Sequence, residues 1–501
     1  MGKKSKAKRK SGPSGGASGP SSAPGARPQE EETLDNLRFE DPFEDEFADD
    51  DDMEIVDASA GDGLTGGGGG RDAGTTVLNE TGGDDGAAAS QRKAWMPGTE
   101  LNSDEVLEYD QSAYTMYHAM KPEWPCLSFD ILPDTLGTNR TRFPHTMTAV
   151  AGTQADEAKK NKLTVMRLGD MGRTYKKPSG EGSDDEDAMS DSDSDGGGDN
   201  TDDDPTLDHR DIPHYGGVNR VRCMPQRPSV VASHGATGHV HLWDVSSHLA
   251  SFEKGGGGGA LNNRALQSHG GHKDEGYAMD WSRKEEGALV TGDCAGGIHL
   301  WKPGEGGKWA VTPGWEAGTS VEDLQWSPSE ATVFASADCN KNISIFDVRK
   351  TGSPMLAHKA HESDVNVISW NRNVTNLLAS GSDDGVFSVW DLRMFGKDPL
   401  ARFTTHTTPI TSLEWHPTDE SMIVVSDESA VFVYDLSVEE DAEEIAKTNA
   451  LAEDENAIPA QLLFLHAGSV SNKECHWHPQ IPSLVMTTAL TGFNVFIPSN
   501  L

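Results

Sequence analysis

Carboxylates are the most abundant side chains in this sequence that could act on another molecule, and they are concentrated in three segments. The 501-residue chain has 81 Asp and Glu against 42 Lys and Arg, a formal net charge of −39. Residues 30–57, 181–211 and 438–455 carry net charges of about −14, −13 and −7, so they hold most of the excess. Flexible carboxylates capture basic proteins quickly and reversibly, whereas they repel nucleic-acid phosphate. The segments therefore predict a basic protein partner and no direct binding of nucleic acid.

Large apolar side chains are interleaved with the carboxylates of residues 30–57. Such a segment buries too little surface to fold alone, but it can become ordered on a basic, partly apolar partner. A purely solubilising acidic tail is the alternative that composition leaves open. The candidate partner-binding residues of the three acidic segments are Phe39, Phe43, Glu44, Asp45, Glu46, Phe47, Asp184, Asp185, Glu186, Asp187, Glu439, Glu440, Asp441, Glu443, Glu444, Asp454 and Glu455.

Four serines in the second acidic segment have the spacing of acidophilic kinase substrates. An acidic residue directly follows Ser183, Ser190, Ser192 and Ser194. Phosphorylation would add a charge of about −1.5 to −2 at each site and so strengthen the attraction to a basic partner. An unmodified acidic linker is the alternative. We expect the two acidic insertions to span residues 178–211 and 438–460.

The N-terminal residues have the opposite charge, since residues 3–10 contain six Lys and Arg. No apolar stretch follows this cluster, so it predicts import into the nucleus or nucleolus rather than secretion. A solvated basic tail is the alternative, and shuttling through the cytoplasm stays open. We expect residues 1–94 to be a disordered tail. Five singly spaced cysteines fit a reducing compartment, and no apolar run of about 18 residues predicts a membrane span.

A short repeated unit must position these segments, and its clearest copy is residues 361–393. Apolar runs at 365–370, 377–380 and 386–390 predict three strands. The turn at 383–385 ends in glycine and predicts a tight hairpin, because glycine adopts positive φ without a steric penalty. One such sheet buries too little surface to be stable alone, so the unit must recur.

The unit recurs with a period in the forties. An aromatic residue closes the third predicted strand of successive units at steps of 45, 44 and 44 residues, and Asp follows it in most of them. This period with a terminal Trp-Asp is typical of WD40 repeats, each of which forms one blade of a β-propeller. The closing aromatics are Trp301, Phe346, Trp390 and Tyr434, and the tryptophans that end the first strand are Trp281, Trp326, Trp370, Trp415 and Trp477.

We therefore predict an all-β fold, a seven-bladed WD40 β-propeller over residues 123–501. Blade one lacks the terminal Trp-Asp, and blade seven is expected to run from Leu465 to Ile497. A ring of blades must close, because an open sheet edge invites aggregation. We expect a segment from the N-terminal side to supply the last strand of blade seven.

Residues 103–120 have apolar side chains at roughly helical spacing, and Ser103 can cap a helix there. We expect an N-terminal α-helix within residues 95–122. A helix that leads into the Glu-Trp-Pro-Cys-Leu motif at 123–127 resembles the histone-binding WD-repeat family. That resemblance implies a clamp for a histone helix, made by this helix and the 438–460 loop. The clamp residues on the helix are Leu107, Tyr114 and Tyr117.

Over about residues 95–501 the sequence resembles the glutamate-rich WD-repeat family of eukaryotic ribosome-biogenesis factors. The motifs that carry the resemblance are at 214–222, 289–294, 320–328, 364–370 and 476–479. The resemblance implies a nuclear or nucleolar chaperone that shields a basic protein of the large ribosomal subunit. It implies delivery of that protein to pre-60S ribosomal particles by a monomer that needs no cofactor.

Two other functions stay open. The first is a chaperone for histones H3 and H4 that uses the clamp. The second is a substrate receptor of a cullin ubiquitin ligase, because Asp391, Arg393 and Arg349 belong to motifs by which some propellers bind the ligase adaptor.

Several patterns resemble metal or catalytic sites but have a structural explanation. Cys475-His476-Trp477-His478 could suggest a metal cluster, yet His-Pro also follows Trp415, so the motif is an element of the repeat. The Asp, His and Ser residues of each blade could suggest catalytic triads, but we expect them to tie strands together. We therefore predict neither a catalytic site nor a metal site, and we expect a protein that is not an enzyme.

Overall fold

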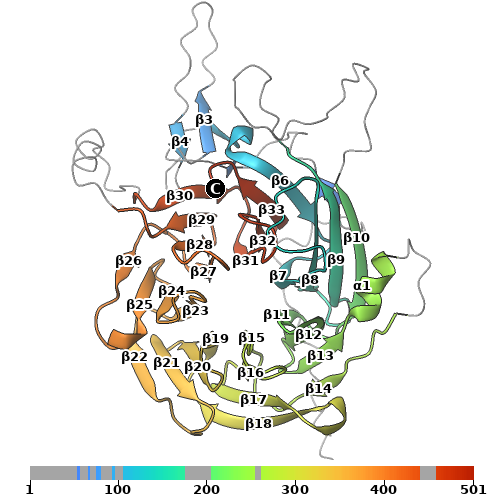
Figure 1. Ribbon diagram of the computed structural model, residues 1–501, viewed down its shortest axis with the longest axis vertical. Helices are drawn as coiled ribbons and strands as arrows, with labels where there is room; N and C mark the ends of the chain where they lie inside the picture. Colours follow the sequence, from blue (N-terminus) through green and yellow to red (C-terminus); the bar gives the residue numbers. More distant parts are fainter. Residues whose placement is uncertain are drawn as a thin grey trace, which may run out of the picture. The chain divides into compact units, whose positions relative to one another are not determined.

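Seven sheets are arranged around a central channel (Figure 1). Within the described residues the fold is a seven-bladed β-propeller, so the predicted fold class is confirmed. The computed structural model describes residues 105–174, 205–253, 261–439 and 459–501, together with strands β1 (Glu54–Val56), β2 (Gly66–Gly67), β3 (Thr75–Asn79) and β4 (Lys93–Trp95).

Blades one to six each contain four strands that are consecutive in the chain and pair antiparallel. From the inner to the outer edge, blades one to three contain β7 (Cys126–Ile131), β8 (His145–Thr153), β9 (Lys162–Met171) and β10 (Thr206–Pro213); β11 (Val218–Met224), β12 (Arg227–Gly235), β13 (Val240–Asp244) and β14 (Gln267–His269); and β15 (Ala278–Trp281), β16 (Leu289–Gly292), β17 (Gly297–Pro303) and β18 (Trp309–Glu316). Blades four to six contain β19 (Val321–Trp326), β20 (Val333–Asp338), β21 (Asn342–Asp347) and β22 (Leu356–Lys359); β23 (Val365–Trp370), β24 (Leu377–Ser382), β25 (Phe387–Asp391) and β26 (Ala401–Phe403); and β27 (Ile410–Trp415), β28 (Met422–Asp427), β29 (Ala430–Asp435) and β30 (Leu462–Ala467).

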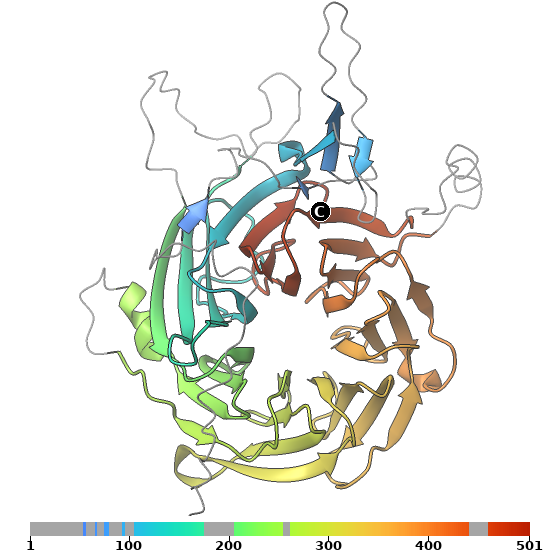
Figure 2. The same cartoon turned by 180° about the vertical axis from the view of Figure 1, so that it is seen from behind.

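The innermost strands contact one another in cyclic order, so the ring is closed. The order is β7, β11, β15, β19, β23, β27, β31 (Asn472–Trp477) and then β7 again. Figure 2 shows the same ring from behind. Apolar side chains pack between neighbouring blades, as Phe387 of blade five does with Phe432 and Tyr434 of blade six. The core is therefore a series of clusters around the ring rather than one central cluster.

Blade seven joins the two sides of the chain. Its inner strands are β31, β32 (Val485–Ala489) and β33 (Gly492–Pro498), and β6 (Tyr114–Lys121) pairs antiparallel with β33 as the closing strand. The predicted closure from the N-terminal side is therefore confirmed. Strand β1 pairs with β6, and β2 pairs with β30 of blade six, which adds an outer strand to each of these two blades.

The helix predicted within residues 103–120 is wrong where the structure describes this segment. Residues 105–108 form strand β5 (Glu105–Glu108), a 3-10 turn covers Gln111–Ala113, and β6 follows directly. Strand β6 is buried on both faces, so its apolar residues do not alternate with polar ones. A short apolar run of this kind cannot be distinguished from a helix by its spacing. The α-helix that the described residues do contain is α1 (Ser246–Phe252), in blade two.

Two predicted boundaries are also wrong by one strand. The first acidic insertion was expected to reach residue 211, but Thr206–Pro213 form β10, the outer strand of blade one. Blade seven was expected to begin at Leu465, but Leu462–Ala467 form β30, which pairs with β29 in blade six. Each sequence repeat thus starts on the outer strand of the preceding blade, which staggers the repeats relative to the sheets.

The remaining described elements are small. Strands β4, β3 and β5 form a separate three-stranded sheet in that order. Short 3-10 turns occur at Glu305–Gly307 and Leu392–Met394. No helix in the described part of the chain is long and apolar enough to cross a membrane.

Candidate protein-binding surfaces

Blade five contains the residue types of a hydrolytic triad in a structural arrangement. His361 Nε2 and the Ser380 hydroxyl are hydrogen bonded at 2.7 Å, and Trp390 Nε1 donates to the same hydroxyl at 2.8 Å. The Ser380 side chain is fully buried, so it cannot reach a substrate. The three residues join β24 and β25 to the segment that enters the blade.

The same arrangement occurs in blades two and three, which confirms the expected role of these residues in tying strands together. His214 and Trp243 both bond Ser233, at 3.2 and 2.9 Å. In blade three a threonine replaces the serine, and His272 and Trp301 bond its hydroxyl at 2.8 and 3.0 Å.

The apparent metal motif at 475–478 is occupied by structural contacts. His478 Nδ1 accepts the backbone N–H groups of Gln480 and Ile481, both at 3.0 Å. His476 Nδ1 donates to the Glu414 carboxylate at 3.1 Å, and Cys475 is buried. Among the residues that the structure describes, no group of three or more His, Cys, Asp and Glu side chains is placed to hold a metal ion.

A buried ion cluster joins blade seven to blades one and two. The Glu474 carboxylate lies 2.7 Å from Arg220 Nη1 and 2.6 Å from Arg222 Nη2. It also accepts the backbone N–H of Phe129 in blade one at 2.9 Å. The Glu474 side chain is only 1% exposed, and although burial opposes ionisation, Arg222 and the other nearby cations hold its pKa well below the usual range. The cluster fixes the closing point of the ring and was not anticipated from the sequence.

Polar side chains on the inner strands also link other neighbouring blades. Asp280 and Gln325 accept the backbone N–H of the tryptophan that ends the inner strand of the next blade, at 2.7 and 2.8 Å. Ser369 and Glu414 do the same at 3.2 and 3.0 Å. Burial raises the pKa of Asp280 to about 7, against the opposing effect of its bond to Trp326. These links satisfy the otherwise open edges of the inner strands.

The residues expected to form a helix clamp lie in or beside blade seven. Tyr114 and Tyr117 belong to β6 and are 1% and 5% exposed, and their rings stack at 5.1 Å. The Tyr114 hydroxyl is bonded to His466 Nδ1 at 2.8 Å. Leu107 lies in β5, and its side chain is outside the described residues. Tyr114 and Tyr117 therefore stabilise the closing strand in this structure.

The ends of the acidic segments lie in three neighbouring blades. Residues 175–204 connect β9 to β10 in blade one, and residues 440–458 connect β29 to β30 in blade six. Both connections join the third strand of a blade to its outer strand, so in equivalent blades they start from the same face of the ring. The third acidic segment ends in β1, on the outer edge of blade seven.

Most of the predicted acidic partner-binding residues lie outside the described residues. The exception is Glu439, which is exposed just after β29. Ser183, Ser190, Ser192 and Ser194 also lie outside the described residues.

The predicted adaptor-binding residues occupy equivalent positions in two adjacent blades. Arg393 follows β25 and bonds the Asp391 carboxylate through Nε and Nη2, at 2.9 and 2.6 Å. Arg349 makes the same contacts with Asp347 after β21. The two arginine side chains are 69% and 74% exposed, so the guanidinium groups remain accessible although they are paired.

Two family models match this chain. The WD40 repeat model matches residues 352–391 and 397–435, which form blade five and most of blade six with the strand before them. The model of the histone-binding protein RBBP4, a component of the CAF1 complex, matches residues 104–171. The second match covers β5, the closing strand β6 and most of blade one.

Three relatives resemble the chain over most of its length. A protein of Arabidopsis thaliana named HEAT STRESS TOLERANT DWD 1 is 46% identical over 82% of this chain and 92% of the relative. Glutamate-rich WD repeat-containing protein 1 of Dictyostelium discoideum is 43% identical over 82% of this chain and 85% of the relative. Ribosome assembly protein rrb1 of Schizosaccharomyces pombe is 40% identical over 80% of this chain and 84% of the relative.

Proposed function

Because this chain belongs to the glutamate-rich WD-repeat family, which includes a ribosome assembly protein, we propose that it is a nuclear chaperone for a basic protein of the large ribosomal subunit. It shields the positive charge of this client, carries it to the nucleolus and releases it at pre-60S particles. The propeller acts as a rigid scaffold, and binding rather than catalysis is its task.

The observation that carries the proposal is the placement of the acidic segments. The connections at 175–204 and 440–458 leave the same face of blades one and six, and the third acidic segment ends on blade seven, which lies between them. Carboxylates rooted in three adjacent blades act together on one client, because a tethered group has a high effective concentration. Each exposed ion pair is weak and screened by salt, so the client is held by many contacts and stays exchangeable.

The test is affinity purification of the full chain from nuclear extract at moderate salt, with the bound basic proteins identified by mass. We expect one large-subunit ribosomal protein in stoichiometric amount. In a variant with Glu439, Glu440, Asp441, Glu443 and Glu444 changed to the corresponding amides, its recovery should fall severalfold.

A matched control removes the same number of charges elsewhere. Glu286, Glu305, Glu330, Glu362 and Asp398 are exposed residues of blades three to five, and their amide variants should retain the client. Equal loss in both variants would show that only net charge matters and would contradict a dedicated site. Stoichiometric recovery of histones H3 and H4 instead would assign the chain to chromatin, in line with its match to the histone-binding model.

The exposure of two equivalent arginines favours a second candidate, a substrate receptor of a cullin ligase. Arg349 and Arg393 present their guanidinium groups from adjacent blades. The double change Arg349→Ala and Arg393→Ala should abolish capture of the ligase adaptor and leave capture of the ribosomal protein unchanged. Adaptor binding that survives the double change would refute this candidate.

A further inference from the structure

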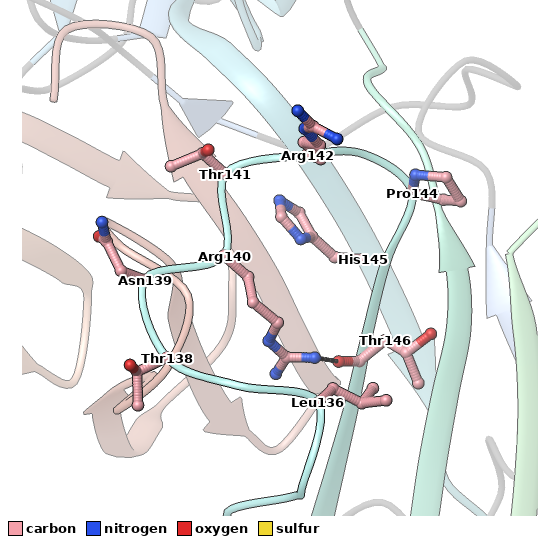
Figure 3. A pocket seen from close by; sticks show the side chains of 9 residues that line it. All are labelled: Leu136, Thr138, Asn139, Arg140, Thr141, Arg142, Pro144, His145 and Thr146. Carbon is pink, nitrogen blue, oxygen red and sulfur yellow. Dashed lines mark hydrogen bonds between the residues drawn. The ribbon is translucent and has the colours of Figure 1, made fainter.

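The turn between β7 and β8 of blade one surrounds a hollow of about 380 Å³ (Figure 3). Two arginines, a histidine, three threonines and an asparagine line it, and no carboxylate is among the lining residues. Such a surface is unexpected on a chain with a net charge of −39. Its residue types are those that contact phosphate groups in proteins that bind nucleic acids.

Arg140 holds this turn in shape. Its Nη1 donates to the carbonyl oxygen of Thr146 at 3.0 Å, as Figure 3 shows, and its Nη2 lies 3.1 Å from the Asp134 carboxylate. The Arg140 side chain is only 14% exposed. Its charge therefore lies close to the hollow, while its hydrogen bonds are used inside the protein.

Arg142 and Arg173 are the accessible cations next to the hollow. Both are exposed, and neither forms an ion pair with any residue that the structure describes. The Arg173 guanidinium lies 5.0 Å from the centre of the Phe143 ring, which orients it beside the turn. Two unneutralised guanidinium groups can thus accept an external anion without breaking an existing ion pair.

The buried histidines report a positive local potential. Burial lowers the pKa of His145 to about 4, and Arg140 and Arg173 contribute to this shift by repulsion of a second positive charge. Burial, Arg140 and His145 lower the pKa of His478 to about 3 in the neighbouring turn of blade seven. The two histidines are therefore neutral at physiological pH, and the arginines supply the positive charge.

The aromatic ring at this site is not available to stack on a base. Phe143 contacts Arg173 as described, and it packs against the His145 ring at a centroid distance of 4.4 Å. Sequence-specific recognition of single strands uses free aromatic faces, whereas contacts of Arg, Thr and Asn with the backbone are independent of sequence. The hollow thus fits phosphate and sugar groups better than bases.

The hollow lies directly beside an acidic segment. Arg173 is adjacent to Thr174, the last described residue before the connection at 175–204. The carboxylates of that connection are tethered close to Arg142 and Arg173 and repel any approaching phosphate. A basic client that neutralises them would remove this repulsion.

We propose that the hollow formed by Arg140, Arg142, Thr138, Asn139 and the adjacent Arg173 binds the phosphate backbone of single-stranded RNA, and that the acidic segments suppress this contact until a basic client neutralises them. The second half rests on the proposed function. The first half limits the expectation of no nucleic-acid binding to the chain with its carboxylates free. Client capture and RNA contact then become coupled events on one protein.

The RNA contact is tested without any client. Binding of a short, labelled single-stranded RNA of mixed sequence is measured by fluorescence anisotropy at several salt concentrations. The protein is the full chain with the Asp and Glu residues of 181–204 changed to Asn and Gln, which keeps the length of the connection. We expect this variant to bind RNA more tightly than the unchanged chain, because the local repulsion is gone.

Adding Arg142→Ser and Arg173→Ser should weaken RNA binding roughly tenfold at low salt and reduce the slope of log K against log salt by about 1. The matched control adds Arg227→Ser and Arg264→Ser, two exposed arginines of blade two, and should change the affinity less than about twofold. All four side chains are exposed, so unchanged melting temperatures are expected for both variants.

Three outcomes would overturn the proposal: no measurable RNA binding at low salt, equal weakening by the two arginine pairs, or preference for a phosphoserine peptide over RNA. The last would assign the hollow to a phosphorylated protein. Because no client is present, these failures are separate from failure of the chaperone proposal, which the affinity purification detects alone.

Discussion

Blade five and blade seven have the same strand order but are held together differently. In blade five all four strands come from one stretch of chain, and His361, Ser380 and Trp390 join them through a single buried hydroxyl. In blade seven the outer strand β6 comes from the N-terminal side, and the blade is tied to its neighbours by the Glu474 carboxylate.

The difference shows that repeat sequence and ring closure are separate problems. A WD40 repeat contains all the groups of its own hydrogen-bond network, so each repeat can be stable with its nearest neighbours. Closure needs groups that meet only when the ring is complete: Glu474 and Arg220 are 254 positions apart in the chain. An ion cluster suits this place because a buried, unpaired charge strongly destabilises any arrangement that does not complete it.

Removal of the Glu474 carboxylate should be the most damaging change to blade seven. Glu474→Ala leaves two largely buried arginines without their partner and the N–H of Phe129 without an acceptor, which we expect to cost roughly 3–5 kcal/mol of unfolding free energy. Urea denaturation of the purified chain measures it. The control Glu439→Ala removes an exposed carboxylate and should change the stability by less than about 0.5 kcal/mol. Equal, small effects would show that blade seven is not held by this cluster.

The turn glycines of the two blades provide the next comparison. Gly492 has φ +125°, and a Cβ there would lie 2.2 Å from the carbonyl oxygen of Met120 in β6; Gly385 has φ +73°, with the corresponding distance 2.7 Å to His406. Both alanine variants should lose about 1–2 kcal/mol from the backbone strain. Gly492→Ala should lose more, because it also pushes away the closing strand. Hydrogen exchange of the β6 amides should accelerate only in Gly492→Ala, and similar exchange in both variants would contradict this.

The smallest expected effect is a difference in pH dependence. Burial alone would lower the pKa of His476, but the Glu474 and Glu414 carboxylates raise it to about 9, whereas burial lowers the pKa of His361 to about 4. A raised pKa means that the folded state binds the proton more tightly. This stabilisation is complete below about pH 6.5 and is lost as the pH rises through about 9.

Melting temperatures from pH 7 upwards test this difference. The unchanged chain should lose stability more steeply toward about pH 9.5 than His476→Gln, which has no proton to lose. His361→Asn should be less stable at every pH because it loses a buried contact, with the same slope as the parent over this range. Parallel curves for His476→Gln and the parent would mean that His476 is not protonated at neutral pH.

The sequence was most informative where structure is local. Three strands and the turn at 383–385 were predicted in blade five, and the structure has β23, β24 and β25 there, with Gly385 at positive φ. These features depend on residues within about ten positions of each other. The same repeats gave the number of blades, because the period alone counts them.

The sequence was least informative where partners are distant in the chain. Residues 114–121 have apolar side chains on both faces because β6 lies between β33 and β1, and that burial looked like helical spacing. Glu474 gave no indication of its role, since its arginine partners are in blade two. Arg140 and Arg142 stand two positions apart in a turn, and only the fold shows that Arg173 lies near them.

The origin of β6 has a consequence for biosynthesis. Translation proceeds from the N-terminus, so β6 leaves the ribosome early, while Asn494, the hydrogen-bond partner of Tyr117, follows 377 positions later. During nearly all of synthesis the nascent chain therefore carries an unpaired apolar strand with nothing to complete its sheet. A segment that pairs with β6 in the meantime, as β1 does at Glu54–Val56, protects the unfinished product from premature association. A release factor that frees the chain before residue 492 would leave this protection as the only partner of the strand.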